Sequence, residues 1–314
     1  MSDDIHTPRS TGEIISDAVT ALRSSFALIF TLAVPFCAVD LFLREVAQSF
    51  LMRVTPAIGD PQHANGDALL GSLPWCGAGV GFFTGSFFLQ LLLSGAVIAV
   101  GDDLCRGRVP SVRRALAKLG ERGAAIITTG LLFLVVVMLV GTVVAAVPMV
   151  LAGFVALSLG QPALIAVGAV VGVVGALSSF IVLTLRWSLY GPAVVVEERS
   201  FFGALGRSSE LTAARGLPFF ETPKFRLSVL FLVGMALSGV LQSLFLGPRL
   251  AMAVLTGWSL ADGSFPGLAE MPVWFMVPFG LLEVITNAAV IPFSGLLLCF
   301  FAFDLRVRYE GISS

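Results

Sequence analysis

The stretch that decides the fold covers residues 123–185 and reads GAAIITTGLLFLVVVMLVGTVVAAVPMVLAGFVALSLGQPALIAVGAVVGVVGALSSFIVLTL, without a charged side chain. The hydrocarbon core of a bilayer is about 30 Å thick and is crossed by about 20 helical residues. The stretch is too long for one span, and Gly160-Gln161-Pro162 interrupts it with residues typical of a turn. It therefore predicts a tight hairpin of two transmembrane helices, from Gly123 to about Leu159 and from Ala163 to Leu185.

Four further stretches are apolar over a similar length: Phe26 to about Val46, Trp75 to Val100, Leu227 to Leu246, and Val273 to Phe303. Of the 314 residues, 57% are hydrophobic and 12% are charged, whereas soluble domains carry about 25% charged residues. This composition excludes a soluble enzyme, a secreted disulfide-rich module and a disordered chain. We expect an all-α, polytopic membrane protein with six transmembrane helices in a single domain, residues 1–314.

The polar segments between these stretches predict the connections. Residues 1–25 are acidic and lack the basic start and cleavage site of a secretory signal, so the first apolar stretch is expected to remain as a helix. Residues 47–74 and 247–272 are expected to be loops on one side of the membrane. Within the second loop, Arg249 to Leu260 has apolar residues at helical spacing and predicts a short interfacial helix.

The basic residues predict the orientation. If the N-terminus is inside, sixteen of the 19 Lys and Arg residues lie on the inner side, and only Arg44, Arg53 and Arg249 lie outside. Basic residues in short loops favour the cytoplasmic side. The sequence therefore predicts a multi-pass protein with both termini in the cytoplasm.

A short segment of mixed polarity precedes three of the spans, at residues 12–24, 109–122 and 201–215. Each begins with a helix-entry signal, such as Ser10 and Thr11 ahead of Glu13. We predict three cytoplasmic amphipathic helices, each followed by a transmembrane hairpin, in pseudo-repeats of about 11–100, 109–185 and 200–304.

These amphipathic helices have two alternative roles: they pack on the ends of the bundle, or they present a basic surface to lipids or a partner. The residues of the candidate surface are Arg106, Arg108, Arg113, Arg114, Lys118, Arg122, Arg199 and Arg207.

Three segments carry a family resemblance: TGEIISDAVTALRSSFALIF (11–30), RWSLYGPAVVVEERSFFGALGRSSELTAARG (186–216) and FAFDLRVRYEG (301–311). They resemble the membrane-domain family named after glycerophosphoryl diester phosphodiesterase, and related six-helix bacterial membrane proteins. The resemblance implies a helical membrane module only, and we expect this module in a bacterial inner membrane. It implies no phosphodiesterase activity, because the chain has no stretch that fits the catalytic barrel to which some relatives are fused.

Glu283 is the most informative polar residue, because it lies within the last apolar stretch. Glu283, Asn287 and Ser294 recur at helical spacing and share one stripe of the predicted helix. A carboxylate within a span usually faces the bundle interior or a water-filled cavity. Two interpretations stay open: a hydrogen-bonded Glu283 that joins its helix to neighbours through Gln90 or Gln242, or a site for a transported ion, proton or ligand.

Other charged residues suggest ion pairs. Asp40 with Arg44 and Asp304 with Arg308 have the i, i+4 spacing of helical pairs. The densest remaining cluster is expected to be a solvated helix face, with partner docking or a catalytic acid–base pair as the alternatives, and consists of Glu197, Glu198, Arg199, Arg207 and Glu210.

No motif indicates catalysis or a cofactor. The chain lacks GxSxG, HExxH and GxxxxGK[ST], and its two histidines, His6 and His63, lie in polar segments. The four cysteines form no CxxC pair and are expected to be apolar packing residues; a Cys37–Cys76 bridge is the alternative. No catalytic, metal or cofactor site is therefore predicted.

The leading functional prediction is a non-enzymatic membrane protein: a structural or accessory subunit, or a scaffold, with lipids and other membrane-protein subunits as partners. A transporter or channel-like protein that uses Glu283 and Asn287 is the alternative. Nucleic acid is not expected as a partner, because the net charge is −1.

Overall fold

The computed structural model describes residues 8–59, 66–161, 163–199, 201–213, 218–255 and 271–310. Over these ranges the chain is helical and forms no strand. The helices are α1 (Thr11–Ser24), α2 (Phe26–Gly59), α3 (Gly66–Cys105), α4 (Val112–Leu159), α5 (Ala163–Trp187), α6 (Tyr190–Val195), α7 (Phe202–Thr212), the 3-10 turn η1 (Phe219–Glu221), α8 (Pro223–Leu255) and α9 (Val273–Glu310). Six helices are long and apolar enough to cross a membrane, which confirms the all-α class and the six predicted spans.

Several spans are longer than predicted. α2 continues to Gly59 and α3 begins at Gly66, so most of the expected loop 47–74 is helical. The turn-forming residues of this segment are concentrated around 59–67, and a helix satisfies its own backbone hydrogen bonds wherever no turn residue ends it.

The prediction that a separate interfacial helix begins at Arg249 and runs to Leu260 is wrong, because no helix begins at Arg249. α8 continues without a break to Leu255, and residues 256–260 lie outside the described residues. The apolar spacing seen in the sequence belongs to the last turns of α8.

The predicted hairpin between Gly123 and Leu185 is confirmed. α4 ends at Leu159, and Gly160 has φ 66°, a left-handed conformation that glycine adopts at little cost. The backbone N–H groups of Gly160 and Gln161 both donate to the carbonyl of Ala156. These bonds satisfy the end of α4, and α5 begins at Ala163.

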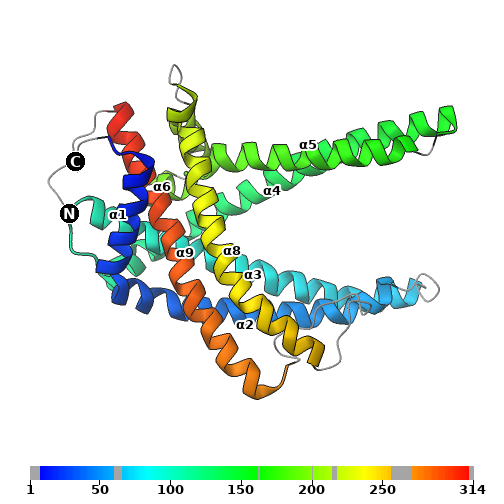
Figure 1. Ribbon diagram of the computed structural model, residues 1–314, viewed down its shortest axis with the longest axis horizontal. Helices are drawn as coiled ribbons and strands as arrows, with labels where there is room; N and C mark the ends of the chain where they lie inside the picture. The colour runs from blue at the N-terminus through cyan, green and yellow to red at the C-terminus, as the bar shows by residue number, and fades with distance from the viewer. Residues whose placement is uncertain are drawn as a thin grey trace.

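Small residues hold α4 and α5 together. A Cβ built at Gly172 would lie 2.5 Å from the carbonyl oxygen of Ala145, and one at Gly175 would lie 2.9 Å from a methyl group of Val144. Close backbone approach of this kind stabilises helix pairs in lipid, where no hydrophobic force drives helices together. Figure 1 shows the pair as an arm that projects away from the remaining helices.

α9 is the centre of the core. It packs against α1, α2, α3 and α8, and it is the most deeply buried of the six spans. Its fully buried side chains include Leu296, Phe300, Phe301 and Leu305. α1 and the C-terminal end of α9 lie at the same end of the molecule, and the two hairpins α2–α3 and α4–α5 extend away from it (Figure 1).

Two of the three predicted amphipathic segments form separate helices. α1 begins with the predicted signal: the Ser10 hydroxyl accepts from the Glu13 N–H at 3.3 Å, and the Glu13 carboxylate accepts from the Ser10 N–H. α7 is the second. The third segment is continuous with its span, because α4 runs unbroken from Val112 to Leu159.

The close α4–α5 contact leads to a first prediction. We expect Gly172→Val to destabilise the hairpin by about 1–3 kcal/mol, because the added side chain forces the two backbones apart. Gly153→Val on the same arm is the matched control, since a Cβ there meets no atom within 4 Å. Detergent-titrated unfolding followed by circular dichroism measures both variants, and equal stability of the two would contradict the packing described.

Candidate functional site

Two layers of charge lie on the same two helices. On α9, Glu283 and Asp304 are 21 residues apart, about 31 Å along the helix axis. On α8, Arg226 and Arg249 are 23 residues apart, about 34 Å. Both separations are close to the thickness of the hydrocarbon core, about 30 Å. The charges therefore mark the two ends of the apolar part of the bundle.

The first layer is centred on Asp304, and we call it the Asp304 network. The Asp304 carboxylate pairs with Arg226 at 2.8 Å and with Arg308 at 2.9 Å, and it accepts from the backbone N–H of Arg9 at 2.6 Å. Asp304 and Arg226 are almost fully buried. The predicted Asp304–Arg308 pair is confirmed, but the sequence did not reveal Arg226, whose partner lies on another helix.

Two further acidic groups lie at corresponding places in the chain. Asp102, at the end of α3, pairs with Lys118 on α4 at 3.1 Å. Glu197, after α6, pairs with Arg207 on α7 at 2.7 Å. In each case the acid lies between one predicted unit and the next, and its partner belongs to the amphipathic segment of the next unit. Asp304, at the end of the third unit, reaches back to Arg9 ahead of α1. The pseudo-repeat itself stays a prediction that this pairing supports.

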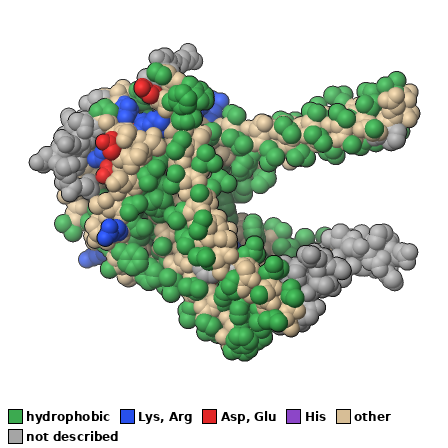
Figure 2. Space-filling view, in the orientation of Figure 1, with side chains coloured by type: hydrophobic (Ala, Val, Ile, Leu, Met, Phe, Trp, Pro, Cys, Tyr) green, Lys and Arg blue, Asp and Glu red, His purple; other side chains and the backbone are tan. Residues whose placement is uncertain are grey.

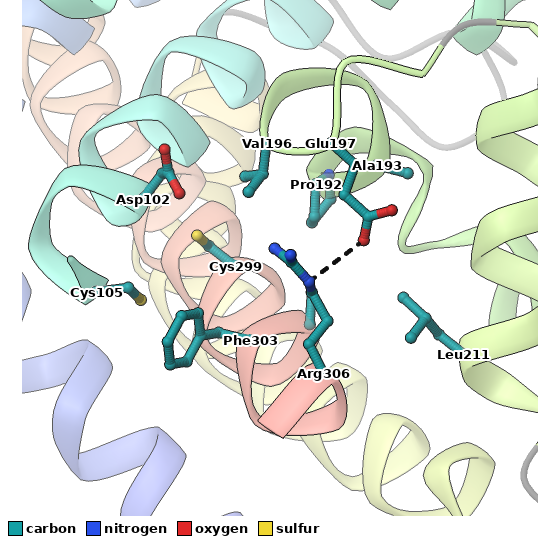
Figure 3. Close-up of a pocket in the computed structure, with 11 residues that line it drawn as sticks. Asp102, Cys105, Pro192, Ala193, Val196, Glu197, Leu211, Cys299, Phe303 and Arg306 are labelled. Carbon is teal, nitrogen blue, oxygen red and sulfur yellow. Dashed lines mark ion pairs between the residues drawn. The ribbon is translucent and has the colours of Figure 1, made fainter. Parts of the chain in front are cut away.

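The ends of α3, α6 and α9 enclose a small cavity between Asp102, Glu197 and Arg306 (Figure 3). Arg306 lies 3.6 Å from Glu197, and Cys105 and Cys299 line the same space. The cavity measures about 10 Å³, which is room for about one water molecule. It is too small for a substrate.

Most residues of the basic surface predicted from the sequence form ion pairs with acidic residues of the same chain. Six of its eight residues are in ion pairs: Arg106, Arg114, Lys118, Arg122, Arg199 and Arg207. Arg108 and Arg113 are exposed, and among the described residues no ion pair involves them. Most of this set therefore has partners within the chain, and its role toward lipids or another protein stays a prediction.

The cluster around Glu197 is not simply a solvated helix face. The side chains of Glu197 and Arg207 are only 12% and 14% exposed, whereas Glu198, Arg199 and Glu210 are exposed. Partial burial alone lowers the pKa of the Arg207 guanidinium, but its hydrogen bonds to Glu197 and Glu310 outweigh that effect and raise the pKa above its usual value. This pair joins α7 to the segment after α6.

The second layer, the Glu283 network, links three helices. Arg44 on α2 pairs with Glu283 on α9 at 3.2 Å and with Asp40 at 3.0 Å. Asp40 also accepts hydrogen bonds from Ser86 and Gln90 on α3. The predicted Asp40–Arg44 pair is confirmed, although Asp40 is buried rather than exposed at an interface. Gln90 therefore donates its hydrogen bond to Asp40 and not to Glu283.

The Glu283 network opens onto a groove between α8 and α9. Its polar half has a volume of about 420 Å³ and is lined by Arg44, Gly239, Gln242, Ser243, Leu246, Arg249, Glu283 and Asn287. Its apolar half, also about 420 Å³, is lined by Leu230, Phe231, Gly234, Met235, Ser238, Gly239, Gln242, Ser294, Leu297 and Leu298. Gly239 and Gln242 belong to both halves, so the halves are continuous.

The structure thus brings the predicted stripe of α9 to one groove. Glu283 and Asn287 line the polar half, and Ser294 lines the apolar half, where its hydroxyl donates to the carbonyl of Val290 at 3.3 Å. α8 contributes the opposite wall, which includes Gln242, one of the two glutamines considered as neighbours of Glu283. Among the described residues no group of three His, Cys, Asp or Glu side chains is placed to hold a metal ion, and the four cysteines are free.

Comparison with models of protein families, with characterised proteins and with solved structures gives no match to this chain. The resemblance to the phosphodiesterase membrane-domain family therefore rests on the three sequence segments alone.

The buried Arg226–Asp304 pair leads to a second prediction. We expect Asp304→Asn to lower the free energy of unfolding by about 3–5 kcal/mol, because Arg226 would remain buried without its carboxylate partner. The control is Asp17→Asn, which breaks an ion pair with Arg9 in which Asp17 is 35% exposed and is expected to cost less than about 1 kcal/mol. Unfolding in detergent measures both. Similar losses for the two variants would show that Asp304 has no special structural role.

Proposed function

We propose that this chain is a non-enzymatic protein of a bacterial inner membrane, and that it serves as a scaffold or accessory subunit for other membrane proteins. The α4–α5 arm is the single observation that carries the proposal. Apart from its helix-to-helix contact, the arm contributes little to the core of the chain, and its large apolar side chains are mostly exposed.

The arm is suited to contact helices of a partner within the bilayer. Exposed side chains such as Leu139, Phe154 and Val170 cover its outer surface, and they carry no charge and no hydrogen-bonding group. Helix association in lipid depends on shape and close packing rather than on hydrophobicity, so such a surface serves equally for lipid and for a fitting helix. Chemistry is not needed for this role, in keeping with the absence of catalytic motifs from the sequence.

The orientation that we propose places both termini in the cytoplasm. It is supported by the distribution of basic residues. Sixteen of the 19 Lys and Arg residues lie before α2, in the α3–α4 connection and the first turns of α4, between the end of α5 and the first turn of α8, or at the end of α9. Figure 2 shows charged side chains gathered at that end of the visible face, while the arm is hydrophobic.

The scaffold role predicts protein contacts on the arm. A photo-crosslinking amino acid at Val170, which is 63% exposed on α5, is expected to give a discrete protein adduct in cells. The same group at Val290, which is 8% exposed on α9, is the control and should give none. Mass spectrometry identifies the adduct. Crosslinks to lipid alone from several arm positions would argue against the scaffold role.

The orientation predicts labelling at the tip of the arm. Gln161→Cys is expected to react with a membrane-impermeant maleimide added to intact spheroplasts. The reason is that residue 161 lies at the tip of the arm, at the end opposite the Asp304 network. The native cysteines provide the background, since Cys37, Cys105 and Cys299 are buried and Cys76 is half-buried. Labelling only after the membrane is permeabilised would mean that the orientation is inverted.

A transport role at Glu283 and Asn287 is the second candidate, and the open polar half of the groove favours it. If Glu283 relays protons, proteoliposomes with the native chain should dissipate an imposed pH gradient, and Glu283→Gln should abolish that leak. A gradient held as well as in protein-free vesicles would eliminate the relay.

A further inference from the structure

We propose that the groove between α8 and α9 binds one phospholipid with a zwitterionic headgroup that bears an ammonium group. The headgroup occupies the polar half, next to Arg44, Arg249 and Glu283, and one acyl chain follows the apolar half toward Leu298. This binding site is independent of the scaffold role. It lies at the place of the second candidate function, but it requires no transport.

The chemistry of the lining changes along the groove in the way an amphiphile requires. At one end two guanidinium groups, a carboxylate and the Asn287 amide face the space. At the other end the walls are formed by aliphatic and aromatic side chains with two serines, and the Ser294 hydroxyl is already bonded to its own helix. A small polar solute would leave the apolar half unfilled, and a hydrocarbon would place an apolar surface against the charged and amide groups of the polar half.

The length of the groove agrees with one lipid molecule. From Glu283 to Leu298, α9 covers 15 residues, about 22 Å of helix. One leaflet of a bilayer, with half of the hydrocarbon core and one headgroup layer, is about 20–22 Å thick. The charged layer around Glu283 lies near the end of the hydrocarbon core, which is the depth at which a headgroup begins.

Charge complementarity selects the headgroup. Two guanidinium groups, those of Arg44 and Arg249, and one carboxylate, that of Glu283, line the polar half, and Glu283 lies 3.2 Å from Arg44. Arginine is well suited to phosphate, with which it forms two parallel hydrogen bonds. A phosphate beside the guanidinium groups leaves Glu283 facing no cation of the ligand, whereas an ammonium group beside Glu283 supplies one. A lipid with both groups therefore fits better than an anionic lipid.

Gly239 provides a way to fill the groove without disturbing the fold. It lines both halves, and a Cβ built there meets no atom within 4 Å. In Gly239→Leu the new side chain occupies the space assigned to the lipid, and replacing a glycine within α8 favours the helix. Gly153→Leu is the matched control, because a Cβ at Gly153 also meets nothing within 4 Å but lies on the distant arm.

The test is native mass spectrometry of the full chain in detergent with equimolar phosphatidylethanolamine and phosphatidylglycerol of the same acyl composition. The native chain and Gly153→Leu are expected to retain one phosphatidylethanolamine per chain. We expect Gly239→Leu to weaken this binding by about tenfold or more, and Glu283→Gln to weaken it by about tenfold, the loss of one charged hydrogen bond. Phosphatidylglycerol binding should change little in Glu283→Gln.

Three results would overturn the inference: no retained lipid on the native chain, equal retention by Gly239→Leu and the native chain, or a native preference for phosphatidylglycerol. Detergent-titrated unfolding of each variant separates loss of the site from loss of the fold. Because the readout is binding, a failure of proton flux in proteoliposomes leaves the outcome unaffected, and the scaffold role is judged separately by crosslinking on the arm.

Discussion

The buried ion pair between Arg226 and Asp304 is the interaction on which the arrangement of the bundle depends. Asp304 is surrounded by donors from three parts of the chain: the segment before α1, the first turn of α8, and α9 itself. A carboxylate removed from water in this way is stable only when its partners are all in place. It therefore holds α8 and the N-terminal segment in one position against α9. The Arg226 guanidinium also lies 5.3 Å from the ring of Phe301, next to the most deeply buried part of the core.

The same two helices carry a second charged layer near the other end of the apolar region. Between the layers, α9 presents Phe293, Leu296, Leu297 and Phe300 to the core, and no ionised group interrupts it. A membrane tolerates charges at its boundaries far better than at its centre. The spacing of the two layers therefore follows from the thickness of the hydrocarbon core. The groove between α8 and α9 extends from one layer toward the other, and for that reason it is polar at one end and apolar at the other.

The chain divides into a bundle and an arm. The bundle is joined by buried charges and by the packing of α9 against α1, α2, α3 and α8. Along the arm, α4 and α5 approach most closely at glycines, and most of the arm's surface is exposed. Our two proposals follow this division: the arm is suited to contact other helices, and the groove in the bundle is suited to a lipid. Either can hold without the other.

The sequence by itself determined the six spans, the α4–α5 turn and the short-range ion pairs, because hydropathy, turn chemistry and the i, i+4 spacing are properties of neighbouring residues. It also singled out Glu283, since a carboxylate in an apolar stretch is conspicuous. It misjudged the helix ends at Gly59, Gly66 and Leu255, where helices extend beyond their apolar stretches. Only the tertiary structure decided that Arg44 reaches Glu283, 239 residues away, that Arg226 meets Asp304, and that α8 completes the groove. Such partners are set by how the helices pack, which no local pattern encodes.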